Sequence, residues 1–512
     1  MRALGRRGAA LLFMASAAAV AAQQASPQPP PEVFGESIDV RVVNVEAEVT
    51  DAKGERVHGL SAGDLRLLVD GRETPIEYFT EVEQGKASTA GPQAPVAAGE
   101  GVGRNYLLYI DESFAVARLR DSFLDKLERD LPRLAPGDRM AVLASDGTRL
   151  DVLCGWTGDA ATLAAALERA HRRPTGGNQQ IAHQRSLKAD VDLLLENSIG
   201  DGDPSPYGNI MATEMAALSG RSSPEARSRL GKTAPSVATA LRGFEAPPGR
   251  KVLLFVSAAW SLRVEAGLYR PMIEAANQLG YTVYPVDTAQ ADPYEIIALD
   301  HLAAATGGRA VLSSALEPFR EVVDDSGSYY WLGFTPVWKA DDRRHRVTVE
   351  TRRPGLTVRA RAGFADTSKQ TRNALKAESV LLFGSAGSDR RLAVRFGEAR
   401  RVGRGEVEVP LTLDIPFESL TLVPTGGGYA AEVFLAMICK DENGERAEQP
   451  RARMRTTVPA VPTAGATARF HVTVRLRNIR QRLAITVQDP ASGNSLWGEA
   501  DYPPRGAADG RE

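Results

Sequence analysis

The chain has 512 residues, of which 43% are hydrophobic, 25% charged and 6% aromatic. This balance supports packed cores and several domains, and it excludes a globally disordered chain, a collagen and a coiled coil. Because 62 Lys and Arg face 64 Asp and Glu, the charge does not favour nucleic acid as a partner, and the two cysteines exclude a disulfide scaffold.

Segment 1–22 has the three parts of a secretory signal peptide. Arg2, Arg6 and Arg7 precede an apolar run over 9–20, and small residues follow. The alternative is a membrane anchor, but the run is too short for that, because crossing a bilayer takes about 20 apolar residues. We therefore expect an exported chain without a membrane span, found in the periplasm, in the outer envelope or outside the cell.

Two polar linkers enclose a small β-rich module at 33–82. The Pro, Gln and Ser residues of 23–32 cannot bury apolar surface, so this linker is expected to stay extended. Gly, Ala, Pro and Ser residues in 83–103 predict the second linker. Within the module, apolar and polar residues alternate over 43–49 and 65–69, which is the period of a half-buried strand.

The pattern changes over 104–326. Continuously apolar strands are expected at 106–110 and 251–256, while apolar residues at every fourth position over 119–131 predict a helix. Strands that alternate with helices indicate a Rossmann-like domain with a mostly parallel sheet covered by helices. The looser stretch at 172–235 is expected to be a partly helical insertion.

The chain becomes β-rich again from residue 327. Segment 327–366 is expected to form a β extension that begins with an aromatic strand at 328–334. Many short alternating segments over 378–503 predict a β-sandwich of about 120 residues, and 504–512 a disordered tail. The expected fold class is α/β, with a small N-terminal β module and a C-terminal β-sandwich flanking the parallel-sheet domain.

The most informative polar residues follow the strand at 106–110. In an open parallel sheet, ligands bind at the carboxyl ends of the strands, near the point where the strand order reverses. Asp111 and Ser113 stand in the loop after this strand, where alternate residues can converge on one point. Their carboxylate and hydroxyl oxygens are the kind of ligand that Mg²⁺ and Ca²⁺ take, so they are the candidate metal ligands.

The run from Tyr109 to Ala115 resembles Asp-x-Ser-x-Ser, the opening of the metal-ion-dependent adhesion site of von Willebrand factor A domains. The wider chain, over 33–365, resembles bacterial exported "VWFA-related" proteins of the kind common in Acidobacteria. This resemblance implies a von Willebrand A-type domain within 104–326. The segments that carry the wider resemblance are 45–51, 59–64, 70–71, 248–257, 329–334 and 353–364.

The same resemblance implies an ion site that has lost most of its ligands. Ala115 lacks the hydroxyl of the third position, and Ser257 begins the run that stands where these domains usually place an Asp. Thr175 is the candidate for their Thr ligand. One carboxylate with one hydroxyl is a poor match for an octahedral cation, because water supplies comparable ligands. We therefore expect no bound cofactor, with Asp111 and Ser113 bonded to loop amides instead.

These observations predict an exported, non-enzymatic protein of the interaction or adhesion type. Glu112, Phe114 and Trp260 are the expected contacts with an unidentified protein ligand. Three alternatives stay open: a metal-dependent adhesin of the same layout, an envelope hydrolase and a structural scaffold. A hydrolase needs a nucleophile paired with a base, and the chain has no His-Glu-x-x-His, Gly-x-Ser-x-Gly or Cys-x-x-Cys motif.

Overall fold

The structure is a computed structural model of the whole chain. The residues that it describes are 42–88, 101–147, 149–178, 224–244, 246–258, 269–288, 293–312, 314–337, 340–383, 390–442, 446–448 and 451–503. The expected signal peptide at 1–22, the linker at 23–32, the tail at 504–512 and Trp260 lie outside these residues, as does most of the expected insertion at 172–235.

The predicted fold class is wrong for the chain as a whole. The described residues contain 25 strands in five sheets, and only one six-stranded sheet is mixed, while the other four sheets are antiparallel throughout. A dominant, Rossmann-like parallel sheet of the von Willebrand A type is therefore not what organises this molecule. The prediction gave too much weight to the middle of the chain, because strands buried on both faces stand out in a sequence more clearly than half-exposed antiparallel ones.

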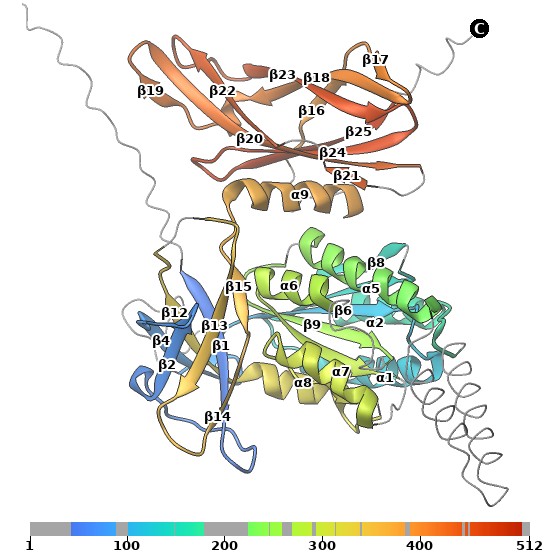
Figure 1. Cartoon of the computed structure of the whole chain (residues 1–512), viewed down its shortest axis with the longest axis vertical. Coiled ribbons are helices and arrows are strands. Elements are labelled where there is room, and N and C mark those ends of the chain that lie inside the picture. The colour runs from blue at the N-terminus through green and yellow to red at the C-terminus, as the bar shows by residue number, and fades with distance from the viewer. Residues whose placement is uncertain are drawn as a thin grey trace, which may run out of the picture.

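The mixed sheet lies in the lower part of Figure 1 and has the order β11-β10-β9-β6-β7-β8. All neighbouring pairs in it are parallel except β7 and β8. Its strands are β6 (Arg104–Asp111), β7 (Arg139–Ser145), β8 (Leu150–Thr157), β9 (Arg250–Ser257), β10 (Tyr281–Asp287) and β11 (Val311–Leu312).

Helices cover both faces of the mixed sheet, so alternate residues of β6 belong to two different cores. Leu107 and Tyr109 pack with residues of α5 and α6, whereas Leu108 and Ile110 pack with residues of α1, α2 and α8. This two-sided burial explains the continuous apolar run in the sequence. The helices of this unit are α1 (Ala117–Asp130), α2 (Ala160–His171), α5 (Pro224–Gly243), α6 (Arg270–Leu279), α7 (Pro293–Ala304) and α8 (Pro318–Gly327).

The two segments expected at 33–82 and 327–366 form one β unit. The order of its first sheet is β14-β1-β12-β4-β5 and that of its second is β15-β13-β2-β3, so each sheet combines strands from both segments. Both segments contribute to a single buried core. The strands are β1 (Val43–Thr50), β2 (Leu65–Val69), β3 (Arg72–Thr74), β4 (Tyr78–Glu83), β5 (Lys86–Ala87), β12 (Tyr329–Phe334), β13 (Arg344–Thr351), β14 (Thr357–Ala360) and β15 (Gly363–Ala365).

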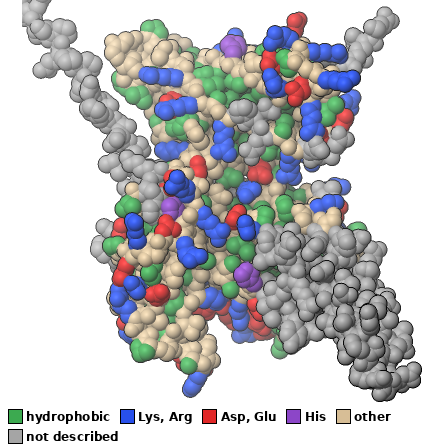
Figure 2. Space-filling view, viewed as in Figure 1, with side chains coloured by type: hydrophobic (Ala, Val, Ile, Leu, Met, Phe, Trp, Pro, Cys, Tyr) green, Lys and Arg blue, Asp and Glu red, His purple; other side chains and the backbone are tan. Residues whose placement is uncertain are grey.

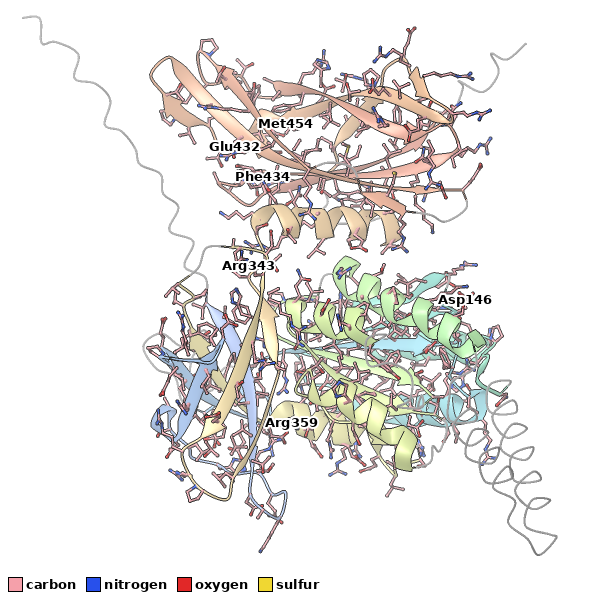
Figure 3. All side chains as sticks on the ribbon, in the orientation of Figure 1. Asp146, Arg343, Arg359, Glu432, Phe434 and Met454 are labelled. Atoms are coloured by element: carbon pink, nitrogen blue, oxygen red, sulfur yellow. The ribbon has the colours of Figure 1, made fainter. Side chains whose placement is uncertain are left out.

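Charged side chains join this β unit to the mixed-sheet unit. Arg359 extends from β14 toward α8, where its Nη2 lies 2.6 Å from Asp325 Oδ1 (Figure 3). Burial lowers the pKa of Arg359 to about 10. This ion pair therefore links the two units across their boundary.

The C-terminal part is a sandwich of two antiparallel sheets that enclose one apolar core. One sheet contains β16 (Ala393–Phe396), β17 (Arg400–Gly403), β18 (Glu406–Pro416) and β23 (Thr467–Arg477). The other contains β19 (Val423–Thr425), β20 (Gly428–Asp441), β21 (Arg446–Glu448), β22 (Ala452–Val458), β24 (Gln481–Gln488) and β25 (Ser495–Tyr502).

A helix that the sequence reading missed, α9 (Lys369–Phe383), lies between the sandwich and the mixed-sheet unit (Figure 1). Its Ala377 and Val380 pack against Ala436, Ala484 and Trp497 on the outer face of the β20–β24–β25 sheet. Three short 3₁₀ turns complete the described elements: Ala62–Asp64, Leu131–Arg133 and Phe417–Ser419. None of the helices in the described ranges combines the length and hydropathy needed to cross a bilayer.

Candidate functional site

The candidate site is the edge of the mixed sheet at which β6, β7, β9 and β10 end. These strands are mutually parallel, and the register places Asp111 beside Ser145 of β7 and Asp287 beside Ser257 of β9. Within the sheet, β7 pairs with one edge of β6 and β9 pairs with the other. The strand order therefore reverses at β6, which is the place where ligands bind in open α/β sheets.

Asp111 is the last residue of β6 and is fully buried. Its Oδ2 accepts a hydrogen bond from Ser257 Oγ at 2.8 Å, and its Oδ1 accepts one from the Ser113 amide at 3.1 Å. Burial raises the pKa of Asp111 to about 7, because removal from water penalises the ionised form more than these hydrogen bonds favour it. The carboxyl group is thus held by the protein and exchanges its proton near neutral pH.

Ser113 lies where the loop after β6 meets the loop after β7 and helix α5. A Cβ placed on Gly147 would be 3.2 Å from Ser113 Oγ, 3.4 Å from Lys232 Cβ and 3.7 Å from Thr233 Oγ1. Thr233 Oγ1 is buried and has no hydrogen-bond partner among the described residues. The tertiary structure therefore brings α5, from the far end of the expected insertion, to the candidate site.

Glu112 is buried and ion-paired, so it does not present a contact surface. Its carboxylate pairs with Arg173, whose Nη2 donates to Glu112 Oε2 at 3.0 Å and to Asp151 Oδ2 at 2.8 Å. Arg173 is in turn about a quarter exposed, with 26% of its side chain accessible. The outward-facing charge at this position is therefore that of the Arg173 guanidinium, which the sequence reading did not single out.

The segment around Thr175 closes over the loop after β6. The Gly176 amide donates to the Glu112 carbonyl at 2.7 Å, and the Gly177 amide donates to the Ala115 carbonyl at 3.2 Å. Thr175 Oγ1 is buried without a hydrogen-bond partner in the described part of the chain. The segment that carries the candidate ligand Thr175 thus packs against the loop that carries Asp111 and Ser113.

Replacing Gly177 by alanine is expected to displace this segment and to destabilise the mixed-sheet unit by about 1–3 kcal/mol. The new Cβ would lie 2.2 Å from the Phe114 carbonyl oxygen and 2.5 Å from the Ala115 carbonyl oxygen, so backbone must move. Urea unfolding and proteolysis within the segment measure the effect. Gly155→Ala, at a position where nothing lies within 4 Å of the added Cβ, is the matched control, and equal losses in the two variants would contradict the close packing.

The other predicted residues separate into buried and undescribed ones. Phe114 is 3% exposed and belongs to the core on the α5 and α6 side of the sheet, so its ring does not face a partner. Ala115 is fully buried and contributes no side-chain oxygen. Trp260 lies outside the described residues. Cys154 and Cys439 are buried thiols that form no disulfide in the described part of the chain.

A divalent cation, which the family resemblance implies, does not fit these donors well. Both Asp111 oxygens already accept hydrogen bonds, and Ser257 offers a hydroxyl where a second carboxylate would be needed. In the described ranges, no group of three His, Cys, Asp or Glu side chains could hold a metal ion. Mg²⁺ requires several oxygen ligands in strict octahedral geometry, and the Asp111 carboxyl is already engaged by the protein through both oxygens.

Comparisons with known proteins do not assign the chain to a family. No protein-family model matches it, and no curated protein matches it. Among solved structures, the crystal structure of the TFIIH p34 N-terminal domain is 15% identical, with 44% of this chain and 96% of that chain covered and a TM-score of 0.21. The β-glucuronidase of Bacteroides uniformis is 10% identical, with 35% and 19% covered and a TM-score of 0.15. TM-scores this low do not establish a shared fold.

Proposed function

We propose that this chain is an exported, non-enzymatic protein that binds another protein at the carboxyl edge of the mixed sheet without a divalent cation. The observation that supports it is the state of Asp111, which is fully buried and bonded through both oxygens to Ser257 and Ser113. Because both oxygens already accept hydrogen bonds from the protein, this carboxyl group has less capacity left to coordinate a metal ion. The sequence resemblance to exported VWFA-related proteins supports the same role.

The proposed contact surface differs from the one expected from the sequence. Because Glu112 and Phe114 are buried, the exposed residues around them carry the contact in this proposal. These are Asp146 and Arg149 in the turn between β7 and β8, together with Lys232 of α5. Asp146 is labelled at the outer end of this edge in Figure 3. Polar residues of both signs favour a specific but moderate interface, since rim charges mainly steer and orient a partner.

Site-specific photo-crosslinking in the native host tests the proposed surface. A photoreactive amino acid in place of Arg149 is expected to capture a protein partner in the presence of EDTA. The same photoreactive amino acid in place of Arg404, which is exposed in the turn after β17, is the control. A product at 149 that is absent at 404 supports the proposal. Loss of that product on chelation would contradict the cation-free mode, and no product at 149 would contradict the surface.

Export is a separate part of the proposal and rests on the sequence of segment 1–22 alone. Fractionation of expressing cells, followed by N-terminal sequencing of the mature chain, is expected to find the protein outside the cytoplasm with a new N-terminus close to Gln23. An intact Met1 on cytoplasmic protein would contradict export.

A metal-dependent adhesin is the second candidate, because Thr175 Oγ1 and Thr233 Oγ1 are both buried without partners among the described residues. Unpaired buried hydroxyls are costly, and a bound ion with its waters would supply partners. Calorimetric titration with Mg²⁺ and Mn²⁺ distinguishes the two modes. Tight binding that is lost in Asp111→Asn would support the metal-dependent mode, whereas binding weaker than millimolar would support the cation-free one.

A further inference from the structure

A large polar cavity lies where the sandwich meets the mixed-sheet unit, away from the site at Asp111. Its volume is about 520 Å³, and it is lined by the end of α5, parts of β9 and β10, helix α9 and the turn between β24 and β25. This is the size of a pocket for an ordinary small-molecule ligand, and such pockets occur preferentially between domains. Figure 2 shows Lys and Arg side chains at the level between the upper and lower parts of the molecule.

All the charged side chains in the described lining of this cavity are positive. Its described lining contains five cationic side chains and no Asp or Glu; the five are Arg242, Lys251, Lys369, Arg372 and Lys376. Like charges gathered in a partly enclosed space repel one another more strongly than charges in bulk water, and they concentrate a positive potential inside it. An anion in the cavity would remove this repulsion.

Three of these cations, Arg242, Arg372 and Lys376, form no ion pair with a carboxylate among the described residues. Lys376 donates to the Ser495 hydroxyl at 3.0 Å, which is a neutral acceptor. Arg242 and Arg372 form no ion pair with a carboxylate in the part of the chain that the structure describes, and Arg372 is exposed to solvent. No carboxylate of the described chain therefore neutralises these two guanidinium groups.

The architecture of α9 directs its cations into the cavity. Lys369, Arg372 and Lys376 are spaced by three and four residues, so they share one face of the helix. Ala377 and Val380, on the adjoining face of the helix, pack on the sandwich. Arg242, in the last turn of α5, approaches from the other wall. The positive groups thus come from two units of the fold and converge on one space.

The remaining lining gives the cavity a second character. Leu241, Leu279 and Leu375 form apolar surface beside the cations. Gln488 is 8% exposed, and its Oε1 is buried without a hydrogen-bond partner among the described residues. A ligand with anionic groups, an apolar body and a hydroxyl or amide donor would match all three features, because few convergent polar groups on an apolar wall are what orient a small molecule.

We propose that this cavity binds a small organic anion that carries at least two carboxylate or phosphate groups. Such a ligand pairs with Arg242 on one wall and with Arg372 and Lys376 on the other, so it also joins the sandwich to the mixed-sheet unit. Arginine and lysine recognise carboxylates and phosphates by the same charge-assisted hydrogen bonds, and the two chemistries are distinguished by experiment.

Calorimetric titration of the full chain at low salt tests the proposal, with citrate as the polycarboxylate probe and inorganic pyrophosphate as the phosphate probe. At least one of them is expected to bind with a sub-millimolar dissociation constant and to raise the unfolding temperature. Removing one charged donor is expected to weaken binding roughly tenfold, and Arg242→Gln combined with Arg372→Gln roughly a hundredfold. A preference for one probe identifies the anionic group that the cavity selects.

Arg404→Gln is the control, because it removes the same charge from an exposed turn of the sandwich remote from the cavity. It is expected to leave binding within about twofold of the native chain, as non-specific charge effects are small at a single exposed site. Lys376→Gln provides a second variant, and circular dichroism of each variant verifies its folding. The proposal is overturned if neither probe binds at millimolar concentration, if the double variant binds like the native chain, or if Arg404→Gln weakens binding as much as Arg372→Gln.

Discussion

Asp138→Ala is expected to destabilise the mixed-sheet unit by about 3–5 kcal/mol. Asp138 is 1% exposed and accepts hydrogen bonds from the Arg104 amide at 2.9 Å, from Arg104 Nη2 at 2.7 Å and from the Ala135 amide at 3.0 Å. Alanine leaves the Arg104 guanidinium, in a side chain only 8% exposed, without its carboxylate. A buried unpaired charge costs more than the intact pair gains, so the loss is large. Urea unfolding followed by tryptophan fluorescence measures it.

Asp414→Ala is the matched control for this prediction. Asp414 pairs with Arg469 at 2.8 Å on the sandwich surface, where the arginine is 57% exposed and remains hydrated when its partner is removed. Its loss is expected to cost less than about 1 kcal/mol. Arg104→Met combined with Asp138→Ala is expected to recover stability relative to Asp138→Ala alone, because no unpaired charge remains. If the single and double variants unfold alike, the buried pair is not the origin of the loss.

Asp111→Asn is expected to make the mixed-sheet unit more stable than the native chain at neutral pH, by about 4 kcal/mol. The pKa of Asp111 is raised from 3.8 to about 7, so the folded chain retains a proton that the unfolded chain loses. The contribution of Asp111 to the free energy of unfolding is therefore most favourable below about pH 4 and is lost as the pH rises toward about 7. Asparagine does not ionise, so the variant lacks this decline. Urea titrations across that range in EDTA compare the two profiles.

Asp159→Asn is the control with the opposite sign. Asp159 caps α2 and accepts a hydrogen bond from the Thr162 amide at 2.8 Å; hydrogen bonds from Thr162 lower its pKa. Its carboxylate therefore contributes stability above the unfolded pKa, and this contribution is lost as the pH falls. Asparagine removes this carboxylate, so the variant is expected to lose less free energy of unfolding than the native chain as the pH falls. Parallel profiles for Asp111→Asn and the native chain would mean that Asp111 is ionised when folded, which would favour the metal-dependent mode.

Strands buried on both faces were predictable because a continuous run of apolar residues indicates such burial. The run at 106–110 lies within β6, and that at 251–256 lies within β9. The position of Asp111 at the end of β6 also follows from the sequence, since a polar residue ends a continuous apolar run. Local signals of this kind require no knowledge of the partner strand.

Pairings between distant segments were not predictable in the same way. Val45 of β1 lies opposite Leu332 of β12, and Leu67 of β2 lies opposite Val349 of β13. Alternation shows that each segment is a half-buried strand, but it does not identify its neighbour. The same alternation, spread over four antiparallel sheets, is why the α/β class was wrong for the whole chain.

The places of the apolar strands, and of Asp111 after one of them, follow from the amino-acid sequence, because burial on two faces leaves a continuous apolar run. Three contacts became apparent only in the folded chain: Arg173 covers Glu112, Thr233 of α5 reaches the edge of the sheet, and cations of α5 and α9 share a cavity. These contacts join residues far apart along the chain. No periodicity or motif records them, since the free energy that forms them comes from packing between whole elements.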